Sequence, residues 1–362
     1  MQTKPFVIGV TGNIASGKSV VRNFLANMGA YTIDADLTAQ DSYLPGLPAW
    51  HSILEEFGED LKMPDGQINR SKLGRLVFSD PGLLSRLEEI VHPQVTISIL
   101  EQLQNCVRPV MVVEAIKLIE SDLAQHCDQI WTTAADEDLR LRRLVENRAH
   151  SEEVALRKIK AQSPQEEKIA KSNQVIWTDQ NFEQSYRQTL QAVRALELPL
   201  SHCFWQEDYS INSPQEDDFP WLQQAFDKQT NQEWNRERLY QLMGGKLVPI
   251  LKNESGCVQA QRLSTRQTLA LLTNQVPLKS EQVSNPIALT FLQHWLEGVA
   301  EMLIIPAVTM TSKEAWREGF MPGEDGVGFY PKLSYEVFLK EHGLMPGEVW
   351  MKPIKFIPEK QP

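Results

Sequence analysis

Cysteines, long apolar runs and an excess of positive charge are scarce or missing in this chain of 362 residues. The four cysteines are scattered and form no CxxC pair, so the sequence predicts neither a disulfide framework nor a zinc site. No apolar run approaches the ~20 residues that a helix needs to cross a bilayer, so we expect no membrane partner. Asp and Glu number 47 against 36 Lys and Arg, a formal net charge of -11. A nucleic-acid surface needs a concentrated basic face, so we expect no nucleic-acid partner either.

The first residues of the chain enter a strand-type apolar run, whereas a signal peptide would begin with a charged segment and an apolar h-region. This start favours a cytoplasmic location.

The length predicts two domains, because one hydrophobic core seldom organises more than about 250–300 residues. The first two hundred residues alternate strand-like and helix-like segments, a pattern typical of an α/β fold with a parallel sheet. A helical insertion between the second and third strands, and a charge-dense helical lid over 136–171, interrupt the alternation. We expect the insertion to contain two helices, 82–91 and 95–103, separated by a His92-Pro93 breaker. The predicted strands are 6–10, 31–34, 109–115, 129–133 and 174–177.

The composition changes near residue 200, where an acidic, proline-containing segment begins. We therefore predict one domain over 1–200 and a smaller α+β domain over 205–362. The strands expected in the second domain are 209–212, 246–251, 258–263, 268–272, 302–308 and 349–356.

Residues 12–19 read Gly-Asn-Ile-Ala-Ser-Gly-Lys-Ser and fill every fixed position of the phosphate-binding pattern GxxxxGK[ST]. In such a loop the glycines let backbone amides surround a polyphosphate, Lys18 supplies a cation, and Ser19 can bind a magnesium ion. An apolar strand precedes the loop and helix-type apolar spacing follows it, which is the context that an anion site requires. A chance match is the alternative, but this context favours a nucleoside triphosphate site.

A second segment narrows the reaction. We find no Asn-Lys-x-Asp guanine reader, which disfavours a GTPase, and the second predicted strand ends in Asp34 and Asp36. Phosphoryl transfer needs an acceptor hydroxyl to be positioned and its proton received, and a carboxylate at this place can do both.

With these motifs the chain resembles the dephospho-coenzyme A kinase family over about residues 5–195. That family phosphorylates the ribose 3'-hydroxyl of dephospho-CoA with ATP, the final step of coenzyme A synthesis. Order and spacing agree along the whole region. The resemblance is carried by residues 11–19, 33–36, 73–78, 92–93, 120, 127–131, 143–144 and 159–162.

The resemblance implies ATP, Mg²⁺ and dephospho-CoA as ligands, and a role for each matching residue. Asp36 is the implied general base, Lys18 neutralises charge on the transferred group, and Ser19 holds the magnesium ion. Arg143 is the implied first lid arginine, and we predict Arg148 as the second. The acceptor is expected to contact Asp36, Arg70, His92 and Glu120, with Arg70 equally open to a surface role and His92 more suited to packing than to proton transfer. ATP is expected to contact Gly12, Asn13, Ile14, Ala15, Ser16, Gly17, Lys18, Ser19 and Val20.

The chain departs from the family pattern at the lid and near the nucleotide base. The second lid arginine falls on Asn147, with Arg148 next to it, and a single step along a helix turns a side chain by ~100°. Either Arg148 serves after a one-residue shift, which we predict, or the role is weakened. Thr178 stands where the family has Asn, so the adenine contact is expected to differ.

Residues from about 205 onward weakly resemble the GNAT acetyltransferase superfamily. The stretch that corresponds to its pyrophosphate loop, 280–288, has no glycine, and without glycine a backbone cannot easily approach a pyrophosphate. We predict a degenerate acetyltransferase-like domain that serves interaction, stability or metabolite sensing, with a ligand-free scaffold as the equal alternative.

The leading hypothesis is thus a magnesium-dependent dephospho-CoA kinase, with its protein partners unknown. The alternatives are another small P-loop kinase acting on a nucleotide or metabolite, and a catalytically weak protein that senses CoA or nucleotide. The departures at Asn147 and Thr178 motivate the second alternative.

Overall fold

The computed structural model describes most of residues 4–277 and three later segments, 302–306, 321–322 and 349–353. Short gaps fall at 78, 107, 149–150, 199, 201–202, 207–208, 213, 231–233, 247, 249, 254–255 and 267–268. Side chains are described within 4–200 and 214–248, with 147 and 148 among the further gaps. The expected pyrophosphate-loop counterpart at 280–288 lies outside the described residues.

A five-stranded parallel sheet forms the first half of the chain, in the order β2-β3-β1-β4-β5. Its strands agree with the predicted ones to within one residue at each end, because apolar, largely β-branched runs specify buried strands. The order places β1 between β3 and β4, so the chain fills one side of β1 with β2 and β3 before it crosses to the other side with β4 and β5. Such a switch in direction creates a ligand site at the carboxyl ends of the strands. The strands are β1 (Phe6–Thr11), β2 (Tyr31–Asp34), β3 (Val110–Glu114), β4 (Gln129–Ala134) and β5 (Gln174–Trp177).

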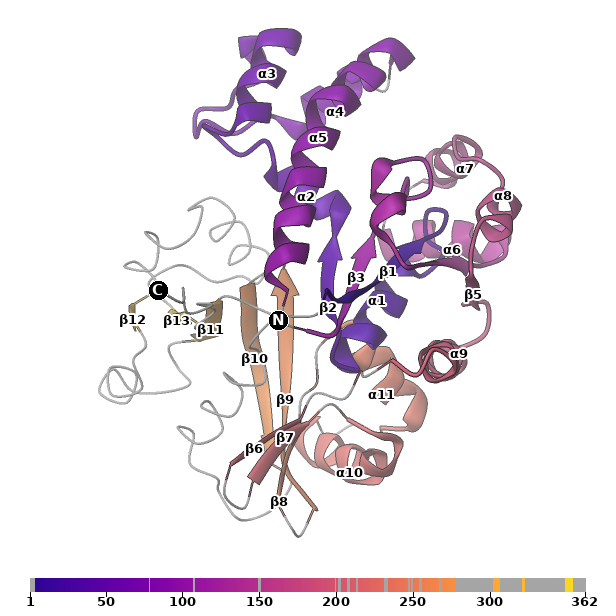
Figure 1. Ribbon diagram of the computed structural model, residues 1–362, viewed down its shortest axis with the longest axis vertical. Coiled ribbons are helices and arrows are strands. Elements are labelled where there is room, and N and C mark those ends of the chain that lie inside the picture. The colour runs from indigo at the N-terminus through magenta and orange to yellow at the C-terminus, as the bar shows by residue number, and fades with distance from the viewer. Residues whose placement is uncertain are drawn as a thin grey trace.

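Helices cover both faces of this sheet (Figure 1). On one face, α1 (Lys18–Asn27) and α9 (Phe182–Ala195) pack around buried Phe24 and Tyr186, whose rings meet edge to face with centroids 5.2 Å apart. The other face is covered by parts of the helical insertion, which comprises α2 (Ala35–Asp41), α3 (Pro48–Phe57), η1 (Glu59–Leu61), α4 (Arg70–Val77) and α5 (Pro81–Asn105). Its outer helices α3 and α4 pack on α5 beyond the end of the sheet (Figure 1).

The expected break at His92-Pro93 is wrong: α5 runs unbroken through both residues. Proline removes one helical hydrogen bond, but the buried Val91, Val95 and Ile99 anchor the helix on both sides of it. His92 and Pro93 themselves are exposed, so solvent can accommodate the local disturbance.

Three short helices lie in the charge-dense region 136–171. The first two pack around a small cluster of Leu144, Ala155 and Ile159, which partly buried Ile14 and Ala15 of the phosphate loop also contact. The helices are α6 (Glu137–Arg148), α7 (Glu152–Lys160) and α8 (Gln165–Ala170), and a short turn η2 (Asp122–His126) precedes β4.

The later strands form a second, eight-stranded sheet in the order β12-β13-β11-β10-β9-β8-β7-β6. It is antiparallel except for the parallel pair of β10 and β11. The strand expected at 246–251 begins only at Ile250. The strands are β6 (Cys203–Gln206), β7 (Tyr209–Asn212), β8 (Ile250–Asn253), β9 (Gly256–Arg266), β10 (Leu269–Pro277), β11 (Met302–Pro306), β12 (Met321–Pro322) and β13 (Val349–Pro353).

Between β7 and β8 lie a turn η3 (Glu216–Asp218) and two helices, α10 (Phe219–Thr230) and α11 (Arg236–Met243). These helices follow the expected domain boundary, yet their buried Phe226 and Tyr240 belong to the same hydrophobic cluster as Phe24 of α1. The core that covers one face of the first sheet therefore continues into the region after residue 205. Within the described residues, no helix is long and apolar enough to span a membrane.

Candidate active site

The phosphate loop joins β1 to α1 in a backbone conformation that requires glycine at two points. Gly12 and Gly17 have φ angles of 144° and 89°, in the region that side chains rarely allow. A Cβ atom on Gly12 would lie 2.4 Å from the Thr133 carbonyl oxygen. The backbone conformation therefore requires glycine at both fixed glycine positions of the GxxxxGK[ST] pattern.

Side chains of the loop and of the lid region hold this conformation. The Asn13 amide donates to the Ser163 carbonyl at 2.9 Å, and the Ile14 backbone N–H donates to Gln162 at 2.7 Å. The Ser16 hydroxyl lies 2.6 Å from that of Thr133. Asn13 and Ser16 therefore support the loop from behind, while its open face is left to a ligand.

Lys18 and Ser19 begin α1, so both lie at the positive end of a helix. The Lys18 ammonium is buried and donates to the carbonyl oxygens of Gly12 and Asn13, each at 3.1 Å. The Ser19 hydroxyl donates to Glu114 Oε1 at 2.9 Å, which links the loop to the end of β3.

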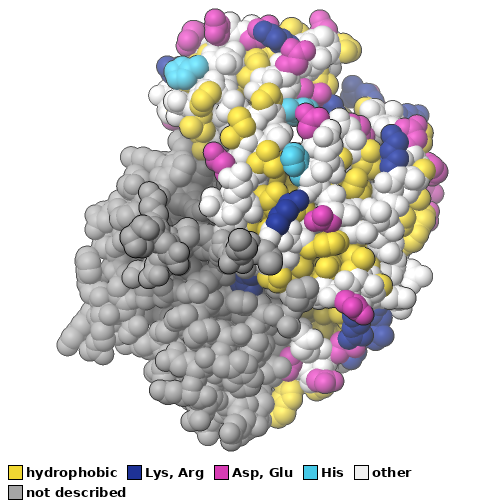
Figure 2. All heavy atoms as spheres, in the orientation of Figure 1, with side chains coloured by type: hydrophobic (Ala, Val, Ile, Leu, Met, Phe, Trp, Pro, Cys, Tyr) yellow, Lys and Arg dark blue, Asp and Glu magenta, His cyan; other side chains and the backbone are white. Residues whose placement is uncertain are grey.

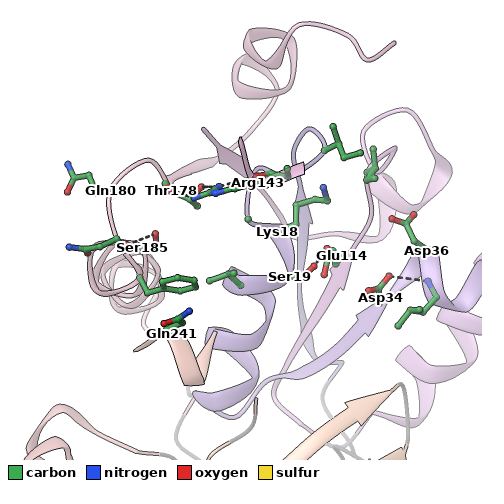
Figure 3. A pocket seen from close by; sticks show the side chains of 18 residues that line it. Lys18, Ser19, Asp34, Asp36, Glu114, Arg143, Thr178, Gln180, Ser185 and Gln241 are labelled. Atoms are coloured by element: carbon green, nitrogen blue, oxygen red, sulfur yellow. Dashed lines mark hydrogen bonds between the residues drawn. The ribbon is translucent and has the colours of Figure 1, made fainter. Parts of the chain in front are cut away.

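A cavity of about 520 Å³ opens over the loop. Figure 3 shows Lys18, Ser19 and Arg143 near its middle, Asp34 and Asp36 at one end, and Gln180, Ser185 and Gln241 at the other. Of the residues expected to bind ATP, those that line the cavity are Ile14, Ala15, Gly17, Lys18, Ser19 and Val20. Gly12, Asn13 and Ser16 form the loop behind them.

Three carboxylates gather at the acidic end of the cavity. Asp34 caps α2 by accepting from the Leu37 N–H at 3.1 Å, and it pairs with Arg22 at 2.9 Å. Arg22 also pairs with Glu114 at 3.1 Å. Asp34 is thus engaged in holding α2 and Arg22.

Asp36, in the first turn of α2, makes no such pair and its side chain opens onto the cavity. Desolvation by the surrounding protein raises the pKa of Asp36, and the neighbouring Asp34 charge raises it further. The positive charges of Lys18 and Arg22 oppose that shift. Burial likewise raises the pKa of Glu114, against the opposing charge of Arg22.

Arg143 reaches from α6 to the rim of the phosphate loop. Its guanidinium donates to the Ala15 carbonyl at 3.0 Å, and to the Thr178 hydroxyl and carbonyl at 3.0 and 2.6 Å. Burial lowers its pKa, although an arginine stays protonated at any ordinary pH. The geometry therefore brings this sequence-predicted arginine to the cavity wall.

Arg70, His92 and Glu120 do not line this cavity. Arg70 donates to Gln40 at 2.7 Å and covers the Tyr43 ring at 5.5 Å, which ties α4 to α2. His92 is exposed on α5, and Glu120 pairs with buried Lys168 at 2.8 Å. Arg148 ends α6, but its side chain lies outside the described residues, so its role stays a prediction.

The donor set near Ser19 fits a magnesium ion. Among the described residues, no three His, Cys, Asp or Glu side chains form a metal-binding group on their own. Mg²⁺ in kinases usually takes one or two protein oxygens and completes its shell with phosphates and water. Ser19 and the adjacent Glu114 supply such oxygens, 2.9 Å apart.

Sequence reasoning missed several residues that line the cavity. Glu114 could have been found, since an acid at the carboxyl end of a buried strand next to β1 is the same signal that pointed to Asp36. Gln180, Asn181 and Phe182 follow β5, where no sequence motif or periodicity marks them as part of a binding site. Gln241 comes from α11, far along the chain, and no local signal points to it.

Charges of both signs are interspersed over the described part of the face in Figure 2, with no single basic patch on that face. This distribution differs from the concentrated basic face that is typical of nucleic-acid-binding proteins.

Comparisons with known proteins agree with the geometry. The model of the family described as "Dephospho-CoA kinase" matches residues 6–184. A dephospho-CoA kinase of Geobacter metallireducens is 39% identical over 187 residues, which cover 51% of this chain and 93% of that protein. A solved Thermus thermophilus protein is 32% identical, with a TM-score of 0.47, over 54% of this chain and 98% of the other.

A ribosomal-protein alanine N-acetyltransferase of Escherichia coli is also similar, at 14% identity and a TM-score of 0.27, over 42% of this chain and 98% of the other. That score is too low to carry an argument, so the degenerate acetyltransferase-like domain stays a prediction.

Proposed function

This chain belongs to the dephospho-CoA kinase family, and on that premise we propose that it transfers the γ-phosphoryl group of ATP to the ribose 3'-hydroxyl of dephospho-CoA. The observation that carries the proposal is a single cavity with the phosphate loop at its centre and an unpaired carboxylate, Asp36, at one end. A bond forms between the acceptor oxygen and γ-phosphorus, the bond to the β-γ bridging oxygen breaks, and ADP and CoA leave.

The half of the site that binds ATP would act on the phosphates through N–H groups and positive charges. Backbone N–H groups of residues 17–19, where the loop enters the N-terminus of α1, would face the phosphates. Lys18 is bound to two loop carbonyls at 3.1 Å, so small movements of its flexible stem would bring its charge to a phosphate oxygen. Arg143 is fixed at the same rim by Thr178. These fixed charges stabilise the transferred group without reorganisation.

Asp36 would receive the proton of the acceptor hydroxyl. Its pKa is raised by desolvation and by the Asp34 charge, which makes it a stronger base than an ordinary carboxylate. Asp34, paired with Arg22, keeps the Asp36 backbone in place by capping α2.

Ser19 and Glu114 would hold the magnesium ion, which neutralises phosphate charge and aligns the γ-phosphoryl group when bound.

The acceptor's remaining parts would lie along the insertion. Arg70 ties α4 to α2, so it would position the helix that carries Asp36. The assignments of His92, Glu120 and Arg148 rest on the family pattern alone. A domain division near 200 and a degenerate acetyltransferase-like fold after 205 are likewise proposals, and the α+β composition of the second sheet and its two helices supports the latter.

The test compares acceptors at fixed ATP and Mg²⁺: dephospho-CoA, nucleoside monophosphates and shikimate. Only dephospho-CoA is expected to turn over rapidly and to raise the melting temperature of the protein. Equal turnover with the other acceptors would contradict the proposal and favour another small P-loop kinase. ATP binding without turnover of any acceptor would favour a sensing role.

A further inference from the structure

α11 lies outside residues 6–184, which the family model matches, yet it reaches the cavity. Its Gln241 is exposed to solvent and lines the cavity together with Val20 and Phe182. Figure 3 shows Gln241 on the same side as Gln180 and Ser185, at the end opposite Asp36.

The order of the residues along the cavity, from Asp36 past Lys18 to Gln241, assigns the Gln241 end to the nucleotide base. The phosphate loop fixes the phosphates near Lys18, and the acceptor must approach from Asp36. The base of the donor therefore has to lie on the other side of the loop. There, the half-buried Phe182 ring offers an apolar face, and the Gln180 and Gln241 amides offer both donors and acceptors.

Hydrogen bonds to both walls of the cavity hold α11 in place. Its Glu237 carboxylate accepts from the backbone N–H groups of Phe182 and Glu183, at 2.8 and 3.1 Å, where α9 begins. Asn23 of α1 donates to the Gly244 carbonyl at 2.8 Å. Gly244 also packs closely, since a Cβ atom there would lie 3.0 Å from Val20 and 3.2 Å from Phe182.

Asn27 of α1 binds the segment after α11 through both atoms of its amide. Its nitrogen donates to the carbonyls of Met243 and Lys246, both at 2.8 Å, and its oxygen accepts from the Val248 N–H at 2.9 Å. Both helices that begin at the cavity, α1 and α9, are thus bonded to α11 or its end.

Packing fixes the residue next to Gln241. Tyr240 is fully buried, and its ring lies 4.8 Å from those of Tyr186 and Phe219. A helix anchored on this buried face fixes the backbone of Gln241 at the cavity, so only its side chain has to become ordered on binding.

We propose that Gln241 binds the base of the donor nucleotide, and that α11 completes the ATP site from outside the family-matched region. The inference rests on the proposed function only in taking ATP as the donor.

The test is calorimetric binding of ATP to the full chain carrying Gln241→Ala. A lost neutral hydrogen bond should raise the Kd for ATP about three- to tenfold. Binding of inorganic tripolyphosphate, which has no base, should stay unchanged. Gln191→Ala is the control, because Gln191 is exposed on α9 and does not line the cavity. It should leave both affinities unchanged.

An unchanged Kd for ATP would overturn the proposal, as would an equal weakening of ATP and tripolyphosphate, which would indicate a merely structural role. Gln241→Met provides a second variant that keeps a good helix former of similar length, removes the amide without adding a charge, and should weaken ATP in the same selective way. The measurement needs no acceptor, so failure to phosphorylate dephospho-CoA would overturn the proposed reaction and leave the result for Gln241 intact.

Discussion

At the scale of the residue, Asp36 is the group whose chemistry depends most on its surroundings. It lies between a carboxylate, Asp34, and two cations, Lys18 and Arg22, in a site that partly removes it from water. Asp34 satisfies its charge with Arg22 and a helix N-terminus, so Asp36 is the carboxylate left for an acceptor. The family resemblance pointed to Asp36 as the base, and the structure shows that Asp34, two residues earlier at the end of β2, is engaged with Arg22 and α2.

We predict that Asp36→Asn lowers kcat by about 10²- to 10⁴-fold, the usual contribution of a general base. The fold should be retained, and the melting temperature at neutral pH should rise, because the substitution removes a desolvated charge beside Asp34. Steady-state kinetics and thermal denaturation measure both. The control is Asp217→Asn, an exposed acid of η3, which should change neither quantity.

The pH dependence has a definite sign. Because the pKa of Asp36 is raised in the folded protein, its protonated form is favoured there relative to the unfolded chain. The stability gained from protonation is present below the unfolded pKa and is lost as pH rises through the folded pKa. Activity should show the opposite trend and fall as the pH drops through that raised value, because protonated Asp36 cannot accept a proton. A kcat/KM profile without an acid limb would contradict this role.

At the scale of the element, the sequence predicts strands better than helix ends. All five strands of the first sheet lie within one residue of their expected bounds, since each is a short apolar run bounded by polar residues. The helix α5 shows the limit of such reasoning. Pro93 signals a break locally, but burial of Val91, Val95 and Ile99 decides the outcome, and burial is a tertiary property.

The junction between α1 and α11 gives a prediction at this scale. Asn27 is buried and bonds three backbone groups, one in the last residue of α11 and two after it, so Asn27→Ala would leave those groups unpaired. The free energy of unfolding should fall by about 1–3 kcal/mol. Chemical denaturation measures this change. Asn105→Ala removes an exposed side chain with a single bond to Glu101, and it should cost far less.

At the scale of the whole molecule, the two sheets are separate but the core of the first is not confined to the family-matched region. Phe219, Phe226 and Tyr240 of α10 and α11 are buried in the cluster that includes Phe24 and Tyr186. Sequence reasoning could not see this, because hydrophobic periodicity tells which face of a helix is buried and not which partner buries it. For the same reason the contribution of Gln241 to the cavity had no signal in the sequence.

A truncation tests this continuity. A fragment of residues 1–200 should expose apolar surface of α1 and α9, bind a hydrophobic dye and melt at a lower temperature than a fragment of residues 1–248. The two fragments differ by α10 and α11 together with β6 and β7. Equal melting temperatures and equal dye binding would show that α10 and α11 do not stabilise the first domain.

The central claim is that this cavity joins ATP to dephospho-CoA. The most direct measurement is the fate of γ-labelled phosphate when the full chain is supplied with ATP, Mg²⁺ and dephospho-CoA. The account predicts that label appears in CoA, with one ADP formed per CoA, and that Asp36→Asn removes nearly all of the transfer. Label that remains in ATP, or is released as inorganic phosphate while dephospho-CoA is unchanged, would contradict it.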